Sequence, residues 1–325
     1  MAKLDYDSFK EYCMTSLVKI LGGSDRYSAE LTTIAKTDNE HIDSIVVHEA
    51  GSTSNLQINF RPKPFYMEYC DGLSLGEVML KILKAVDNPI KLDWKFDPSD
   101  IVYFHMVEKF LILRPLNYHN SKKLLEEHVY LRVYDIALVL YVLVESNEDT
   151  RYTAKVPRSV FSEWGLSENF IIQLATENTA RLYPPMLMPM ETILTASMDG
   201  DTSFSRIPAD KKFFMDPLIP YRLQPSKSHT YFLCVHKGIN GAMAPFYPGV
   251  LDKLCDMFKD DLYICFTSAR ECAVHPASTI SLSAIKANAK EVYQNPQLLA
   301  EEIDNLTQNA YVYYRKDMEL KIAGV

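Results

Sequence analysis

The stretch from Tyr231 to Pro276 constrains the fold most, because strand, turn, helix and strand signals follow one another there. Tyr231–His236 is a short run of β-branched and aromatic residues, which is typical of a buried strand. A glycine turn at 237–241 follows, and Pro248 then stands at the expected start of a helix. Its apolar stripe consists of Val250, Leu251, Leu254, Cys255 and Phe258. A second apolar run, Leu262–Phe266, predicts the next strand.

A polar pentad, Thr267–Glu271, separates this strand from a further apolar run, Cys272–His275. Polar groups between two buried strands must face water or find partners. We therefore expect the functional site here, together with the end of the preceding turn. The predicted binding residues are Asn240, Thr267, Ser268, Arg270 and Glu271.

The rest of the sequence, together with this stretch, predicts an α+β protein. We expect mixed or antiparallel sheets packed with helices and a C-terminal strand-helix-strand-strand core. An opening helix at 6–21 ends at Gly22-Gly23, and we expect its charged side, including Lys10, to be solvated. Alternating runs between 27 and 60 predict a three-stranded antiparallel meander that Pro62 and Pro64 end. Further helices are predicted at 73–86, 99–105, 122–127, 167–179 and 282–292, and a short one after Pro296. Further strands are predicted at 110–116, 129–133, 136–144, 150–156, 310–314 and 320–322.

Some side chains in these elements have a predicted place. Ser121 is expected to cap the helix at 122–127. Phe170 is expected to point inward from the helix at 167–179. In the last long strand, alternation sends Tyr311 and Tyr313 to one face and Tyr314 to the other.

The segment between Thr195 and Ser228 loses all periodicity and is rich in proline, so it is the candidate linker. This predicts an N-terminal α+β domain at 1–195, a linker or surface loop at 196–228 and a C-terminal α+β domain at 229–325. At 325 residues and 47% hydrophobic content, the chain can bury a substantial core.

Charge and cysteine usage narrow the class of protein. A net charge of −8 disfavours binding to nucleic acid and to anionic membranes. The longest apolar run, 136–144, is too short to cross a bilayer, and residues 1–6 lack the apolar core of a signal peptide. Six scattered cysteines without close pairing motifs fit reduced thiols. We therefore expect a cytoplasmic protein with no membrane contact.

Several phrases, taken in this order, resemble a bacterial family of unknown function, DUF5688, which is common in gut Firmicutes and their mobile elements. The phrases are Asp135–Tyr141, Glu177–Leu182, Asn240–Ala242 with Tyr247–Leu251, Asp261–Ile264 and Tyr311–Arg315. The family carries no assigned activity. The resemblance implies kinship and a setting in bacterial mobile elements, where an accessory or counter-defence role is expected.

One departure from the family pattern bears on the site. Similar proteins carry Pro-Ser-Ser-x-His-Glu after the second strand, whereas this chain has Phe266–Glu271, with Arg270 in place of the histidine. A guanidinium stays protonated and has no lone pair, so Arg270 cannot act as a general base or a metal ligand. It can still hydrogen-bond a carboxylate or another anion. This favours a structural or binding role for the pentad over a catalytic one.

Three chemistries compete with simpler structural roles for these residues. Zinc would use Cys234, His236, Cys265, Cys272 and His275, but no ligand pair has the usual close spacing. A hydrolase would use Thr267 or Ser268 with His236 or His275 as base and Glu271 as orienting group, without a recognised nucleophile motif. An anion could bind at the glycine turn 237–241, whose spacing matches neither the P-loop nor the dinucleotide fingerprint.

The resulting hypothesis is a non-enzymatic binding or interaction protein that takes a protein partner or a small anionic ligand. No metal, catalytic residue or cofactor is expected. The alternative is a hydrolase or a nucleotide-binding or nucleotide-processing enzyme that uses the same polar patch at 267–271.

Overall fold

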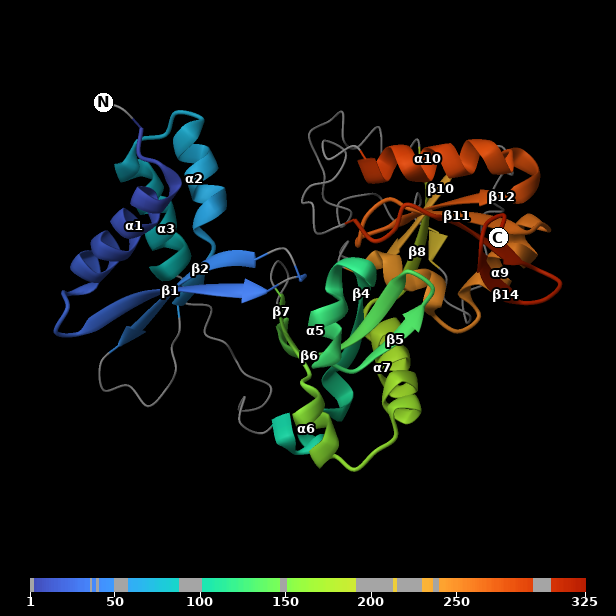
Figure 1. Cartoon of the computed structure of the whole chain (residues 1–325), viewed down its shortest axis with the longest axis horizontal. Coiled ribbons are helices and arrows are strands. Elements are labelled where there is room, and N and C mark those ends of the chain that lie inside the picture. Colours follow the sequence, from blue (N-terminus) through green and yellow to red (C-terminus); the bar gives the residue numbers. More distant parts are fainter. Residues whose placement is uncertain are drawn as a thin grey trace. The chain divides into compact units, whose positions relative to one another are not determined.

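The computed structural model describes residues 3–35, 37–38, 41–49, 58–87, 101–146, 151–190, 213–214, 230–235, 240–294 and 305–325 (Figure 1). Contacts divide the chain into two compact units, Met1–Asp93 and Trp94–Val325. Both contain helices and antiparallel sheets, so the predicted α+β class is confirmed. No helix among the described residues is both long enough and apolar enough to cross a membrane.

Unit 1 packs three helices on a three-stranded antiparallel sheet. Its elements are α1 (Tyr6–Leu21), β1 (Tyr27–Ala35), β2 (His41–Glu49), β3 (Ile58–Phe60), α2 (Pro62–Cys70) and α3 (Leu75–Asp87). The strand order is β1-β2-β3, which confirms the predicted meander. Gly22 ends α1 with φ 133°, as expected for a glycine stop. The core joins Phe9, Cys13 and Leu17 to Ile45 and to residues of α3.

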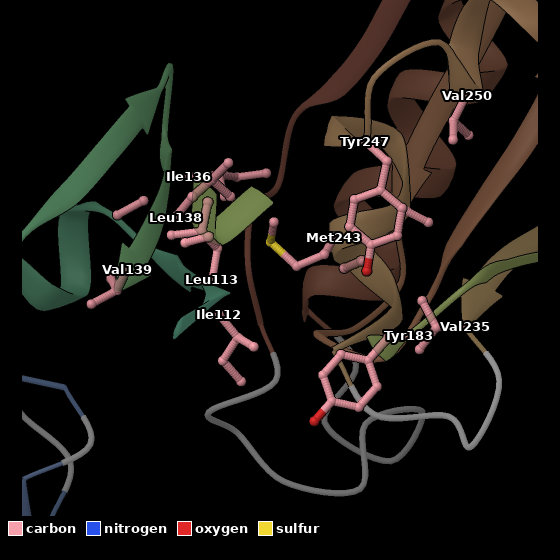
Figure 2. Close-up of a cluster of buried hydrophobic side chains, with 14 of the residues drawn as sticks. Ile112, Leu113, Ile136, Leu138, Val139, Tyr183, Val235, Met243, Tyr247 and Val250 are labelled. Atoms are coloured by element: carbon pink, nitrogen blue, oxygen red, sulfur yellow. The ribbon is translucent and has the colours of Figure 1, made fainter. Parts of the chain in front are cut away.

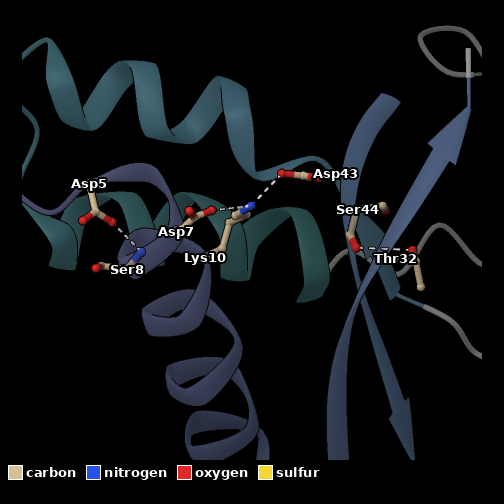
Figure 3. A network of polar contacts seen from close by, with 7 residues as sticks. All are labelled: Asp5, Asp7, Ser8, Lys10, Thr32, Asp43 and Ser44. Atoms are coloured by element: carbon tan, nitrogen blue, oxygen red, sulfur yellow. Dashed lines mark hydrogen bonds and ion pairs between the residues drawn. The ribbon is translucent and has the colours of Figure 1, made fainter. Parts of the chain in front are cut away.

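One expectation for unit 1 was wrong, and one helix was not predicted. The sheet ends before Pro62 as expected, since β3 stops at Phe60, but Pro62 also opens α2. The first helical position tolerates proline because its N–H would be unpaired anyway. Lys10 is buried instead of solvated (Figure 3). Its Nζ lies 2.8 Å from Asp43 Oδ2 and 2.9 Å from Asp7 Oδ1, so carboxylates compensate the buried charge.

Unit 2 contains a seven-stranded sheet in which every neighbouring pair is antiparallel. Its order is β14-β13-β11-β12-β10-β8-β9. The strands are β8 (Pro185–Pro189), β9 (Phe213–Phe214), β10 (Tyr231–Val235), β11 (Leu262–Phe266), β12 (Cys272–Pro276), β13 (Ala310–Tyr314) and β14 (Glu319–Ile322). Helix α10 (Leu282–Gln294) covers one face, where Ile285 and Ala289 pack with Val312. Tyr311 and Tyr313 belong to the core on the other face, as alternation predicted.

Helix α9 (Val250–Phe258) packs into the core on the sheet face that holds Tyr311 and Tyr313. All five residues of its predicted stripe are buried. The segment before it forms a 3-10 helix, η6 (Gly241–Phe246), which the sequence did not predict. Figure 2 shows Met243 of η6 reaching towards Leu113 and Leu138 of a second sheet. Both sheets of unit 2 therefore share one apolar core.

The second sheet of unit 2 has four antiparallel strands. They are β4 (Leu111–Asn117), β5 (Tyr130–Val133), β6 (Ile136–Ser146) and β7 (Arg151–Lys155), with β6 paired to all three others. Helix α7 (Glu168–Leu182) covers the β4 edge, where Leu113 N donates to Thr179 Oγ1 at 2.9 Å. Phe170 at the start of α7 is 48% exposed, so its predicted inward orientation was wrong.

Short helices complete unit 2. They are α4 (Phe104–Val107), η2 (Glu108–Phe110), η3 (His119–Ser121), α5 (Lys122–Glu126), α6 (Arg158–Glu163) and η7 (Ala277–Thr279). Ser121 precedes α5 as predicted, but its side chain makes no capping bond, and its buried hydroxyl has no hydrogen-bond partner among the described residues.

The segment 196–228 lies outside the described residues except for Phe213 and Phe214. Strand β8 precedes it and β10 follows it, and these two strands pair in one sheet. The predicted linker and the domain limits on either side of it stay a prediction. The helix expected after Pro296 also falls mostly outside the described residues.

Candidate functional site

The polar pentad forms the five-residue loop of a β-hairpin. Strands β11 and β12 pair up to Phe266 and Cys272, which leaves Thr267–Glu271 as the connection. Thr267 Oγ1 donates to Glu271 O at 3.2 Å, and the Arg270 amide donates to Ser268 Oγ at 3.0 Å. Both hydroxyls therefore bond within the loop.

The end of the preceding turn packs directly against this loop. Asn240 is buried and left-handed, with φ 57°. Gly241 lies so close to the loop that a Cβ added there would be 1.8 Å from the carbonyl oxygen of Arg270. The amide of Ala242 donates to Ala269 O at 3.3 Å. The structure thus brings together the two segments that the sequence singled out, with backbone contacts between them.

The cationic residues beside this turn were missed in the sequence. Nε of Arg114, on β4, donates to Asn240 Oδ1 at 3.1 Å, and its Nη1 donates to Thr153 Oγ1 at 2.8 Å. The guanidinium carbon lies 4.9 Å from the centre of the Tyr141 ring, and Nζ of Lys155 lies 5.9 Å from that centre. Strand register places Arg114, Tyr141 and Lys155 on one sheet face. The available signal was a charged residue inside the apolar run of β4.

Two positive groups therefore share the ring of a buried tyrosine. Burial lowers the pKa of Lys155, and the charge of Arg114 lowers it further. Burial raises the pKa of Tyr141. Among the described residues, no carboxylate forms an ion pair with Arg114, and its hydrogen-bond acceptors are a neutral amide and a hydroxyl. Guanidinium and ammonium groups in this setting are suited to a carboxylate or a phosphate.

Glu271, on the loop side of the turn, contributes a carboxylate rather than a cationic group. Its side chain is half-buried, and burial raises its pKa, an effect that the neighbouring Arg270 partly offsets. Within the described part of the chain, no donor bonds its carboxylate. A carboxylate of raised proton affinity can accept from, or share a proton with, a ligand donor.

The geometry does not bring the proposed catalytic histidine to the loop. His275 pairs with Tyr263 near the far end of β12. It lies four residues beyond Glu271, roughly 14 Å along a strand that rises about 3.4 Å per residue. His236, the other candidate base, lies outside the described residues.

The cysteines of this sheet are buried thiols. Cys234, Cys265 and Cys272 are all buried, and burial raises the pKa of Cys265 to about 12. Burial also raises the pKa of Cys272, so the thiols of Cys265 and Cys272 stay protonated at neutral pH, whereas the thiolate is the metal-binding and nucleophilic form. The described ranges contain no group of three or more His, Cys, Asp or Glu side chains arranged to hold a metal ion.

Fold and site together define an α+β protein whose second unit carries a polar cluster between a hairpin loop, a left-handed turn and a cationic sheet face. The chain belongs to the family of unknown function DUF5688, whose model matches residues 6–315. Neither the curated proteins nor the solved structures contain a match to it.

Proposed function

We propose that this protein is a non-enzymatic binding protein whose second unit recognises an anionic group, a carboxylate or a phosphate, at Arg114 and Lys155. The Arg114 guanidinium supports this proposal most strongly: it lies over Tyr141, and within the described part of the chain its bonds go to the neutral acceptors Asn240 and Thr153. A guanidinium has five N–H donors in a fixed fork. Two of these donors orient the group, and the described residues leave the others to a ligand.

Electrostatics supports the same ligand class. Arg114 already lowers the pKa of Lys155, so the two cations repel each other across the Tyr141 ring. An anion bound to both would remove this repulsion and raise the pKa of Lys155. The local charge is positive although the chain as a whole carries −8, so recognition depends on this cluster rather than on a global field.

The loop at 267–271 would recognise a second part of the ligand. Asn240 and Gly241 stand between Arg114 and the loop backbone, so the two polar regions flank one turn. Glu271 would accept a hydrogen bond from a donor on the ligand, because nothing described in the chain satisfies it. We propose a small ligand with an anionic group at one end and a donor at the other.

The cellular setting is proposed on the family resemblance: a bacterial cytoplasm and an accessory or counter-defence role in a mobile element. The engaged hydroxyls of Thr267 and Ser268 support a binding role for the loop over nucleophilic chemistry.

The test compares the melting temperature of the full chain in inorganic phosphate and in chloride at equal ionic strength. A ligand that binds the folded state raises the melting temperature by mass action. We expect phosphate to stabilise the wild type and Lys316→Gln, an exposed lysine elsewhere in unit 2, but not Lys155→Gln. Equal stabilisation of all three, or of none, would contradict anion recognition at this cluster.

A further inference from the structure

We infer that strand β1 is a homodimerisation edge that pairs with β1 of a second copy of this chain. β1 (Tyr27–Ala35) has nine residues and stands at the end of the strand order β1-β2-β3. β2 pairs with all nine residues on one side, and no described strand lies on the other. An edge of this length offers a row of backbone donors and acceptors to another strand.

β1 lacks the features that normally protect such an edge. It contains no lysine, arginine or proline, and its pairing with β2 runs without a bulge. The edge strand β14 of unit 2 differs, since it has four residues, two of them charged. There the hydroxyl of Tyr134 also donates to the carbonyl of Leu320 at 3.1 Å. The edge strand β14 thus carries protection that β1 lacks.

The sequence of β1 is complementary to itself in the antiparallel direction. A twofold axis at Leu31, the central residue, places Leu31 opposite Leu31, Glu30 opposite Thr32 and Ala29 opposite Thr33. Glu30 is the one charged residue of the strand, so no like charges face each other. The amide of Tyr27 donates to Gly23 O at 3.0 Å, so alternation along the ladder directs the amides of Ala29, Leu31 and Thr33 to the open edge. Leu31 therefore forms a hydrogen-bonded pair with its own copy.

Leu31 also has apolar surface that this pairing would cover. It lies opposite Ile45, which is fully buried in the core of unit 1, yet Leu31 itself is 42% exposed. A second Leu31 across the axis would extend the apolar face of the sheet and bury both side chains. The complementarity centred on this residue favours a second copy over an unrelated peptide strand.

The experiment measures the mass of the full chain by sedimentation equilibrium over a concentration series. Wild type is expected to form a dimer. Leu31→Lys and Leu31→Glu should each weaken dimerisation at least about tenfold, because like charges face each other across the axis. An equimolar mixture of these two variants should recover the dimer, since lysine then faces glutamate. Leu80→Lys changes another exposed leucine of unit 1, on α3, and should dimerise as wild type.

Circular dichroism of each variant establishes that the chain is folded. A monomeric wild type, or a dimer that survives Leu31→Lys, would overturn the inference. So would equal loss of the dimer in Leu31→Lys and Leu80→Lys, which would indicate general apolar association. Failure of the lysine and glutamate variants to pair with each other would exclude an axis at Leu31.

Discussion

Nε of Arg114 and Oδ1 of Asn240 are hydrogen-bonded at 3.1 Å although 126 positions separate them in the chain. The bond joins strand β4 of the four-stranded sheet to the left-handed residue that opens η6. Arg114 therefore has a structural role as well as the proposed ligand-binding one. Substituting Lys155 tests binding without breaking this bond.

A substitution at Gly241 should strongly lower the stability of unit 2. A methyl group at 241 would collide with the backbone carbonyl of Arg270, which cannot rotate away. We expect Gly241→Ala to lower the free energy of unfolding by on the order of 2–3 kcal/mol. Both tryptophans, at 94 and 164, belong to unit 2, so tryptophan fluorescence during denaturation follows that unit.

The matched control is Gly76→Ala in helix α3 of unit 1. The nearest atom to an added Cβ there is 4.0 Å away, so alanine should stabilise the helix by about 0.5–1 kcal/mol, measured by circular dichroism, which follows both units. A Gly241→Ala protein as stable as wild type would show that the turn does not pack on the loop as described.

Breaking the buried pair Lys10–Asp43 from one side only should strongly destabilise unit 1. Asp43→Ala leaves the Lys10 ammonium buried with Asp7 alone, and we expect a loss of about 2–3 kcal/mol. The double variant Lys10→Met with Asp43→Ala should recover part of this loss, because no buried charge remains. Circular dichroism melts of wild type, Lys10→Met, Asp43→Ala and the double variant complete the double-mutant cycle. If the stability changes of the two single variants simply added up in the double variant, direct coupling of Lys10 and Asp43 would be contradicted.

The Tyr311 hydroxyl should stabilise unit 2, because it donates to the buried carboxylate of Asp135. Thr307 and Asn309 donate to the same carboxylate, so its charge is held by hydrogen bonds. Tyr311→Phe removes one donor and should cost about 1–3 kcal/mol by tryptophan fluorescence. Tyr314→Phe, on the other face of β13, is the control and should change stability little.

The raised pKa of Glu271 predicts that the free energy of unfolding depends on pH. Its pKa in the folded chain is raised by burial, so the folded state binds more protons than the unfolded state. Stability from this group is therefore highest below its ordinary pKa and falls as the pH rises towards the raised value. Glu271→Gln should be more stable than wild type at neutral pH and lose this part of the pH profile. Parallel profiles for the two proteins would contradict the burial of its carboxylate.

The regular elements were predictable where a single periodicity decided them. The stripe of α9 and the alternation of Tyr311, Tyr313 and Tyr314 each follow from local spacing, and the structure confirms both. The α2 helix was missed because proline was taken as a stop rather than as a helix start. Lys10 was misplaced because its partner Asp43 comes from a strand far along the chain.

The site could be predicted only in part for the same reason. Asn240 and the pentad were chosen because polar residues interrupt apolar runs locally. Arg114, Thr153 and Lys155 join them through the pairing of β4, β6 and β7, which no local pattern specifies. The polar residues of Glu177–Leu182 have a structural role instead. Asn178 and Arg181 donate to the backbone of Glu108 and Lys109 beside β4.

Anion binding at Arg114 and Lys155 can be measured directly by calorimetric titration of inorganic phosphate into the full chain at alkaline pH, in two buffers of different ionisation enthalpy. The difference in heat gives the protons exchanged on binding. We predict saturable binding with net proton uptake, because the anion raises the lowered pKa of Lys155. The uptake should vanish in Lys155→Gln and persist in Lys316→Gln. Absence of saturable binding to wild type, or binding that Lys155→Gln retains with the same uptake, would contradict the account.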